Sequence, residues 1–344
     1  MHRSGAIRFV SIALSCLLAA GPVWGWGREG HRIVALLAAK NLSAAARAKV
    51  AAILGTDDAG VDEAMAAAST WPDEINRTAT GTASWHFINV PVTGPFSVGT
   101  LCAQHECVID RITEMEDRLQ NNRTGFMLKS EPIPDRPMTS RELAFLIHFI
   151  GDIHQPLHAS NNGDQGGNCI TLAQPIVHSD GRRDTTKLHA VWDTDEVLSV
   201  MKVLGDENAT AAALYQRFRD GAAVMQLTPL DWARESNDLA RKDIYRKLNI
   251  PHYDETPDNT CAPGIAQLSI AELSSKDASV DPSYLDSNRA DVEERLMQAG
   301  IRLANVLNQI CAGSGCEAYP GAEQASEQAG EQPAPAERRR VDFP

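Results

Sequence analysis

Helical periodicity dominates the pattern of apolar and polar positions along this chain of 344 residues. Apolar residues recur three and four positions apart, as on the buried face of an amphipathic helix. Strand signals are few, and residues 170–172 and 175–177 are expected to form at most a short hairpin. The pattern predicts an all-α fold, a single mainly helical domain with a small β-hairpin possible. The expected helices cover residues 30–40, 43–54, 59–68, 107–121, 139–154, 188–203, 208–225, 229–247 and 287–311.

The two ends of the chain differ in composition from the region between them. Residues 1–25 combine two arginines, an apolar run from Phe9 to Ala20 and small residues near Gly25, which is typical of a secretory signal peptide. The apolar run is shorter than the roughly 20 residues that a membrane-spanning helix needs. Residues 321–344 are rich in Ala, Glu, Gln and Pro and are expected to be a disordered tail. We therefore expect residues 26–320 to form the folded domain of a secreted or periplasmic protein.

The cysteines fit an oxidising compartment. Cys16 lies in the expected leader, and the other six form an even number, as expected for disulfides. Their spacing does not match a zinc finger, so we interpret them as disulfide partners and not as ligands. Two pairs are each five residues apart and could close small loops, which leaves a possible long-range pair: Cys102–Cys107, Cys311–Cys316 and Cys169–Cys261.

The chain is acidic, with a formal net charge of −13 at pH 7. Removal of the expected leader would make it more acidic, because Arg3 and Arg8 are the leader's charged residues. This charge argues against binding of duplex DNA through a basic face. A nucleic-acid substrate is still compatible with it, because bound divalent cations add positive charge that a residue count omits.

Two His-x3-Asp pairs are the strongest chemical signal. His148 and Asp152 lie in the expected helix 139–154, and His189 and Asp193 open the expected helix 188–203. Positions four apart lie on the same face of a helix, so each pair directs an imidazole and a carboxylate at one point. These groups are ligands of zinc-type cations. One such pair is common by chance, but two pairs suggest more than one metal ion.

The surroundings of the first pair favour ligation. Residues 143–150 are apolar apart from His148, and burial of His148 and Asp152 in such a run is costly unless they are paired or ligated. Pro156 is expected to end the helix and to leave His158 on the following loop, beside the first pair. His154 is turned to another face and is expected to be structural. Three histidines without partner spacing are expected at the surface: His105, His178 and His252.

Further donors stand in three short segments that each contain a tryptophan. Taken separately, each segment is a weak signal, since a histidine or aspartate at such a place can simply begin a helix or a turn. Residues 161–168, rich in Asn and Gly, predict a loop close to the metals. The three segments are Trp26-Gly-Arg-Glu-Gly-His31, Trp71-Pro-Asp73 and Trp85-His86-Phe87-Ile-Asn89.

Together, in this order and spacing, these motifs resemble the three-zinc single-strand nucleases of the mung-bean type, the extracellular bifunctional nucleases of the zinc phospholipase C and nuclease superfamily. The resemblance runs from Trp26 to about Asn308 and includes residues 232–236 and 302–308. It implies a mainly helical domain and an enzyme that hydrolyses single-stranded DNA and RNA to 5′-phosphorylated products. It also implies 3′-nucleotidase activity and a monomer.

The resemblance also implies three zinc ions per chain. The first would be held by Asp73, His86, His148 and Asp152. The second would take the free amine and carbonyl of Trp26, together with His31, and share Asp152 with the first. The third would be held by His158, His189 and Asp193. Removal of the leader would then be a chemical requirement, since Trp26 has a ligating amine only after cleavage.

Other roles follow from the same resemblance. Asp73 is expected to orient the attacking water as well as to bind a metal, Phe87 to stack on an unpaired base, and Asn89 and Asn168 to contact the base or phosphate. Phe87 and Trp85 could instead be core aromatics. The chain departs from the family pattern in two places: Asn76, where family members often carry Arg, and Lys187, where they usually carry Asn.

Two alternatives remain on sequence grounds. One is a zinc-dependent phospholipase C that acts on phospholipid head groups. In that relative the last ligand is usually Glu at a shorter spacing, whereas this chain has Asp193 far from His158. The other is a secreted protein stabilised by zinc without catalysis, which the completeness of the ligand set disfavours.

Overall fold

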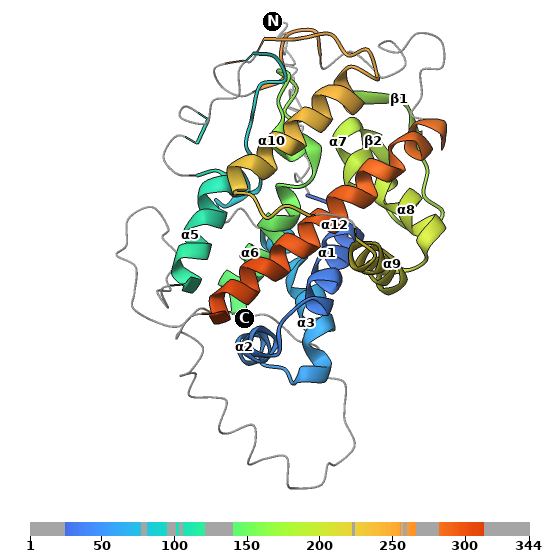
Figure 1. Cartoon of the computed structure of the whole chain (residues 1–344). Helices are drawn as coiled ribbons and strands as arrows, with labels where there is room; N and C mark the ends of the chain where they lie inside the picture. Colours follow the sequence, from blue (N-terminus) through green and yellow to red (C-terminus); the bar gives the residue numbers. More distant parts are fainter. Residues whose placement is uncertain are drawn as a thin grey trace, which may run out of the picture.

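The computed structural model of this protein is mainly helical (Figure 1). It describes residues 25–76, 81–94, 101–102, 106–120, 140–221, 224–254, 256, 260–265 and 282–312. Most of the expected leader and tail, and the Cys311–Cys316 pair, lie outside the described residues. The all-α fold with a small hairpin is confirmed, since the described strands form a single two-stranded sheet.

The regular elements described in the first half of the chain are all helical. Its elements are α1 (Arg28–Lys40), α2 (Ala44–Leu54), a 3₁₀ turn (Asp58–Gly60), α3 (Val61–Ala68), α4 (Trp71–Asn76), a 3₁₀ turn (Ala83–His86), α5 (Val108–Gln120), α6 (Ser140–Asp152) and a 3₁₀ turn (Pro156–Ala159). The short helix α4 and the turn Ala83–His86 were not among the expected helices, because six and four residues are too few to display a helical period.

The second half contains the hairpin and two π-helical segments. Its elements are β1 (Thr171–Ile176), β2 (Thr185–Lys187), α7 (Leu188–Ala190), a π segment (Val191–Asp195), α8 (Glu196–Leu204), α9 (Glu207–Arg219), α10 (Pro229–Leu239), a second π segment (Ala240–Tyr245) and α12 (Pro282–Ala312). A π segment therefore interrupts the expected helix 188–203, and another follows α10 within the expected helix 229–247.

The hairpin differs from its expected form. Both predicted strands lie in β1, which pairs antiparallel with β2, with Thr171 opposite Lys187 and Ile176 opposite Thr185. A return between residues 172 and 175 would need a two-residue turn at Ala-Gln, which lacks the residues that favour positive φ. The chain instead passes Gly181, which has a φ of 86°.

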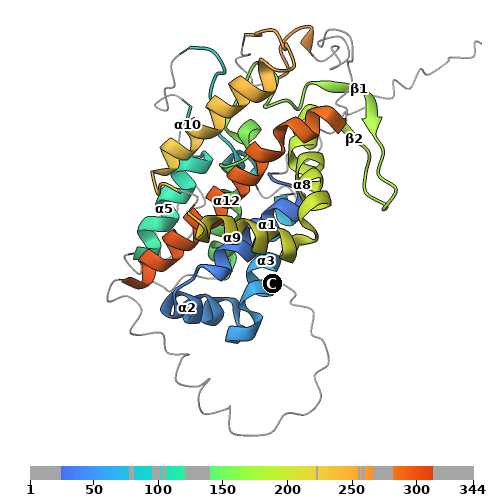
Figure 2. The ribbon, with the colours of Figure 1, turned by 45° about the vertical axis from the view of Figure 1, so that its right-hand side comes forward.

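Helix α1 is the centre of the core. Its residues Gly30–Ala39 are all buried, and α1 packs against α12, α3 and α9. Figures 1 and 2 show the long helix α12 crossing α1, with α10 and α5 on one side and α8 on the other. Gly300 allows the close approach of α12, since a Cβ there would lie 2.5 Å from Cδ2 of Leu37. In the part of the chain that the structure describes, no helix is long and apolar enough to cross a membrane.

Glu196, at the start of α8, is fully buried and accepts a 2.7 Å hydrogen bond from Nδ2 of Asn288 on α12. Burial raises its pKa to about 8, against the opposing hydrogen bond from Asn288. Between about pH 4.5 and 8, the folded protein keeps a proton on Glu196 that the unfolded chain has lost. The protonated carboxyl therefore contributes to the stability of the folded state at low pH, and this contribution is lost as pH rises through that range.

We therefore expect Glu196→Gln to flatten the fall of stability over that pH range. At pH 9 the variant should exceed the parent protein in unfolding free energy by on the order of 2–4 kcal/mol, and at pH 4 the difference should vanish. Chemical denaturation across this pH range measures the effect. The exposed Glu294→Gln, on α12, should show no such pH-dependent gain, and equal profiles for Glu196→Gln and the parent would contradict the assignment.

Candidate metal centre

Helix α6 brings the first pair to its C-terminal end. His148 and Asp152 are fully buried, and Nε2 of His148 lies 3.1 Å from Oδ2 of Asp152. The apolar residues between them fill the core, so the two polar side chains share the one face that meets the N-terminal part of α1 and the turn at His86. The pairing predicted from the four-residue spacing is thus present in the structure.

Two further ligand candidates join this pair from distant segments. Nδ1 of His86 lies 3.0 Å from both Nε2 of His148 and Oδ2 of Asp152. Oδ1 of Asp73, from α4, lies 3.4 Å from Nε2 of His148 and 3.8 Å from Nδ1 of His86. The structure brings together all four side chains that the sequence suggested for a first metal.

A second group forms where the loop after α6 meets α7. Nε2 of His189 lies 3.2 Å from Nε2 of His158 and 3.5 Å from Oδ2 of Asp193, and all three side chains are buried. Asp193 belongs to the π segment that follows α7, and its Oδ1 accepts a 2.6 Å hydrogen bond from Nε2 of Gln155.

The outward nitrogens of three of these histidines face backbone carbonyls. Nδ1 of His148 is 2.7 Å from the Ser69 carbonyl, Nδ1 of His158 is 2.8 Å from that of His86, and Nδ1 of His189 is 2.6 Å from that of Gly166. A carbonyl only accepts, so each Nδ1 must carry a proton, and each Nε2 has a lone pair when the ring is neutral. Such outward hydrogen bonds are the usual support of metal-binding histidines.

The His158 and His189 rings therefore direct two lone pairs at each other across 3.2 Å. Two acceptors so placed repel unless a cation lies between them. Tetrahedral zinc with bonds of about 2.0–2.1 Å separates two nitrogen ligands by roughly 3.3 Å, which matches the observed separation. The donors of this group fit a zinc-type ion.

The start of the expected mature chain lies against the first group. Nε2 of His31 is 3.3 Å from Oδ1 of Asp152, and its ring stacks on that of His148 with centroids 3.9 Å apart. Trp26 is fully buried, and the Gly27 amide donates to the Asp193 carbonyl at 2.6 Å. A Cβ built on Gly25 would lie 1.6 Å from Oδ1 of Asp152 and 2.6 Å from Nε2 of His31. Gly25 therefore lies directly beside Asp152 and His31.

Electrostatics reinforce the need for a cation. Burial opposes the charging of His148, but Asp152 and Asp73 outweigh it and raise its pKa well above the ordinary value. Burial lowers the pKa of His31 to about 4, and the neighbouring His148 adds to this. Burial raises the pKa of Asp193 well above its usual range, with Gln155 opposing. A divalent cation would favour the charged form of Asp193 and the neutral form of the imidazoles.

Several buried polar atoms of the cluster have no hydrogen-bond partner among the described residues. They are both ring nitrogens of His31, Oδ1 of Asp73, Nε2 of His86 and Oδ1 of Asp152. Buried atoms of this kind are normally satisfied, so their convergence agrees with the donor set of a metal centre. A third grouping, of Cys102, Cys107 and Asp110, is not a metal site, because the two cysteines form a disulfide.

The residues expected to contact substrate are close in sequence to candidate ligands or to their supports: Phe87 and Asn89 follow His86, and Asn168 lies two residues after Gly166. Phe87 is partly exposed and, within the described part of the chain, is not among the apolar side chains that pack on the core. Trp85 is instead a core residue, buried between Phe145 and the guanidinium of Arg111. Asn89 and Asn168 are partly exposed.

The structure describes the side chain of one of the two residues that depart from the family pattern, Lys187, and only the backbone of the other, Asn76. Lys187 is partly exposed and directly precedes α7, two residues before His189. The backbone of Asn76 ends α4, and its side chain lies outside the described residues.

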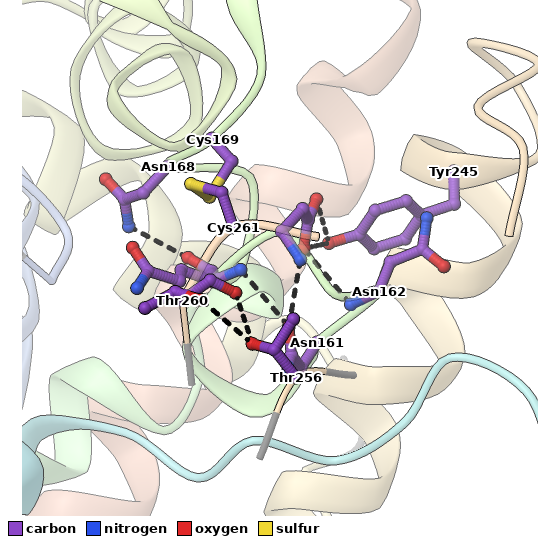
Figure 3. Close-up of a disulfide and its surroundings, with 10 residues drawn as sticks. Asn161, Asn162, Asn168, Cys169, Tyr245, Thr256, Thr260 and Cys261 are labelled. Atoms are coloured by element: carbon purple, nitrogen blue, oxygen red, sulfur yellow. Dashed lines mark hydrogen bonds between the residues drawn. A yellow bond between two sulfur atoms is a disulfide. The ribbon is translucent and has the colours of Figure 1, made fainter. Parts of the chain in front are cut away.

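The long-range disulfide prediction is confirmed. Cys169 and Cys261 are bonded, and Figure 3 shows this disulfide beside Asn168 and Thr260. Since Gly166 holds His189 through its carbonyl, the disulfide anchors the loop that supports one candidate ligand. The disulfide between Cys102 and Cys107 is also present.

Polar residues of α10 and α12 hold the loop after α6, which sequence reasoning did not anticipate. Oγ of Ser236 donates to the Ile153 carbonyl at 2.5 Å, Nδ2 of Asn237 donates to the Ala159 carbonyl at 3.1 Å, and Nε of Arg295 donates to the His154 carbonyl at 3.1 Å. The sequence signal for this support was the presence of polar residues, such as Ser236 and Asn237, on a helix face that is otherwise apolar.

The histidines outside the ligand set have three outcomes. His154 is structural as expected: its Nδ1 donates to the Ile150 carbonyl, and its Nε2 accepts from Arg302. His252 is exposed, as expected. His178 is not a free surface residue, since its side chain is only 9% exposed and lies 3.4 Å from Asp195. His105 lies outside the described residues.

The chain is similar to known proteins over most of its length. The family model described as S1/P1 Nuclease matches residues 26–312. The chain is 28% identical over 325 residues to Nuclease S1 of Aspergillus oryzae, covering 88% of this chain and 98% of that protein. It is 28% identical over 316 residues to Endonuclease 1 of Arabidopsis thaliana, covering 90% and 94%. It is 29% identical over 307 residues to Nuclease P1 of Penicillium citrinum, covering 83% and 97%.

We expect His148→Ala to remove about one or two zinc ions per processed chain, because His148 belongs to the first donor group and stacks on His31, which the resemblance assigns to the second zinc. Elemental analysis of the purified protein measures the loss. The matched control is His154→Gln on the same stretch of chain, which should lower the melting temperature through lost contact with Arg302 but retain the metal. Equal metal content in His148→Ala and the parent would contradict the assignment.

Proposed function

This chain belongs to the S1/P1 nuclease family, and we propose that it is a secreted or periplasmic, zinc-dependent hydrolase of single-stranded DNA and RNA. Its products would be 5′-phosphorylated, and it would also act as a 3′-nucleotidase. The observation that carries the proposal is the buried convergence of five imidazoles and three carboxylates: His31, His86, His148, His158, His189, Asp73, Asp152 and Asp193.

Three zinc ions would be shared among these donors as the resemblance implies. The first would bind Asp73, His86, His148 and Asp152; the second would bind Trp26, His31 and Asp152; the third would bind His158, His189 and Asp193. When bound, zinc supplies a water nucleophile of near-neutral pKa and stabilises negative charge on a leaving oxygen.

Asp73 has the position and charge of an orienting group. It is 5% exposed at the edge of the first donor group. Burial acts to raise its pKa, but His148, His86 and His31 outweigh this and hold the pKa below the usual range. The carboxylate therefore stays ionised at neutral pH and can accept a hydrogen bond from the attacking water, in addition to its role as a ligand.

Selection of single strands would rest on Phe87. Its position beside His86, outside the packed core, leaves an aromatic face that can stack on an unpaired base, an interaction worth ~1–3 kcal/mol. A base within a duplex is already stacked and paired and cannot use that face. Asn89 and Asn168 would contribute polar contacts to the base or phosphate.

Processing of the leader completes the proposed site. We take residues 1–25 as a signal peptide, 26–320 as the nuclease domain of a monomer and 321–344 as a tail. The family match begins at Trp26, which supports this boundary. The approach of Gly25 to Asp152 and His31 supports the same conclusion, because the nitrogen of Trp26 would be freed at that point.

The phospholipase alternative finds less support. The matched relatives are named as nucleases, and their similarity covers nearly their whole length. In the group formed by His158, His189 and Asp193, the last donor is an aspartate and not the glutamate that is usual in the phospholipases. Absence of choline release from phosphatidylcholine vesicles is the outcome expected for this chain.

We expect the processed protein to degrade single-stranded DNA and RNA much faster than duplex DNA, and a chelator to abolish the activity. Zinc should restore it. Product analysis should find the phosphate on the 5′ end. Cleavage that persists in the chelator, or equal rates on single strands and duplexes, would rule out the proposal. A protein stabilised by zinc alone would instead show metal-dependent melting with no turnover.

Replacement of Phe87 tests the stacking role. Phe87→Ala should raise KM for single-stranded substrates roughly tenfold with kcat little changed, because a stacking contact is worth ~1–3 kcal/mol. Phe87→Leu is the matched control: it keeps apolar volume but has no aromatic face, and it should resemble Ala. If Phe87→Leu instead keeps the parent KM, stacking is not the source of affinity.

A further inference from the structure

The second π segment (Ala240–Tyr245) borders a surface pocket that the proposed chemistry does not use. The pocket has a volume of about 390 Å³ and is open to solvent. π segments of this kind are rare and often mark functional sites. The other π segment described in this chain carries Asp193, a candidate ligand. The side chains that set the pocket's character are Arg241, Lys242, Arg246, Asp238, Asn162 and His252.

The pocket is locally basic in an acidic chain. Three cations and one carboxylate, Asp238, line it, whereas the whole sequence carries a net charge of −13. Lys242 is partly neutralised by Asp243, whose carboxylate lies 3.0 Å away. Arg241 and Arg246 are exposed, and neither has a carboxylate within 4.0 Å among the described residues. Two guanidinium groups are thus available to an anion.

The opposite wall is firmly built. Asn162 is 1% exposed, its Nδ2 donates to the Pro251 carbonyl at 2.8 Å, and its Oδ1 lies 3.1 Å from Nδ1 of His252. Because an amide oxygen only accepts, the His252 proton is on Nδ1 and its Nε2 is an acceptor when the ring is neutral. Asp254 lies 3.7 Å from that Nε2.

Two adjacent segments run from the metal ligands to this pocket. One passes from His86 to Val92, and the other from His158 to Asn162. They are joined by hydrogen bonds from the Ile88 amide to the His158 carbonyl, 2.8 Å, and from the Val92 amide to the Asn161 carbonyl, 3.0 Å. Asn162 is four positions after His158, so their Cα atoms are at most about 14 Å apart.

A second connection ties the basic wall to the same loop. The hydroxyl of Tyr245 donates to the carboxylate of Asp164, with distances of 3.1 and 3.0 Å to its two oxygens. Figure 3 shows the Tyr245 ring and Asn162 on the same side of this loop. Two residues further along, the Gly166 carbonyl holds His189. The helix that bears Arg241 is therefore fixed with respect to a candidate metal ligand.

We propose that Arg241 and Arg246 form a subsite for a backbone phosphate of the single strand, away from the phosphate that is cleaved. This assignment rests on the proposed function. Basic grooves that follow the backbone are the usual partners of stacking residues in single-strand binding, and arginine suits phosphate through its paired donors. The subsite would act only on substrates long enough to reach it.

The double variant Arg241→Gln/Arg246→Gln tests the assignment. Binding of a long phosphorothioate oligothymidylate, which resists hydrolysis, should weaken about tenfold, and the slope of log Kd against log salt should fall by about 1.4, or 0.7 for each lost phosphate contact. KM for long oligonucleotides should rise similarly. Hydrolysis of a 3′-mononucleotide should not change.

The control is Lys202→Gln/Arg219→Gln, which removes the same charge from exposed positions on α8 and α9. An equal loss in this control, or unchanged oligonucleotide affinity and salt slope in the test variant, would overturn the subsite. Altered inhibition by inorganic phosphate without a change in oligonucleotide binding would overturn it too, since the pocket would then bind free phosphate. If the parent protein binds the strand but cleaves no nucleic acid, the proposed function fails and the subsite does not.

Discussion

Compensation of buried charge is the constraint on which the centre of this structure depends. Asp73, Asp152 and Asp193 are almost fully buried at one place, together with imidazoles whose lone pairs face them. Burial of ionised groups costs several kcal/mol each unless opposite charge repays it. The raised pKa of His148 and the lowered pKa of Asp152 show how protons would offset part of that cost, whereas burial raises the pKa of Asp193 in spite of the hydrogen bond from Gln155. Divalent cations would satisfy all three carboxylates at once.

The surrounding fold serves mainly to fix these side chains in direction. Carbonyls of Ser69, His86 and Gly166 set the orientation of three imidazole rings. Side chains of α10 and α12 in turn donate hydrogen bonds to backbone carbonyls of the loop that bears His158. A polar network therefore supplements the short 3₁₀ turn there. The consequence is a rigid loop, since each carbonyl that leaves a helix has been given another donor.

Much of this could be predicted from sequence because the relevant signals are local. The four-residue spacing placed His148 beside Asp152, and the even cysteine count left Cys169 for Cys261. Contacts between segments far apart in sequence have no such local signal. The return of the chain at β2, the breadth of support from Ser236 and Asn237, and the contact of His178 with Asp195 depend on tertiary packing, and no periodicity predicts it. Ligand assignments came from resemblance to a family and remain proposals.

The position of Gly25 implies an order of events: the leader is removed first, and the centre is completed afterwards. The residue before Trp26 lies so close to Asp152 and His31 that even a methyl group could not be added to it. If the Trp26 amine is a ligand, an uncut precursor holds an amide where a donor is required, and its centre stays incomplete. Under the proposed function, hydrolysis of nucleic acid would then begin only after the leader has been removed. A leader that directs export would in this way also protect the nucleic acid of the producing cell.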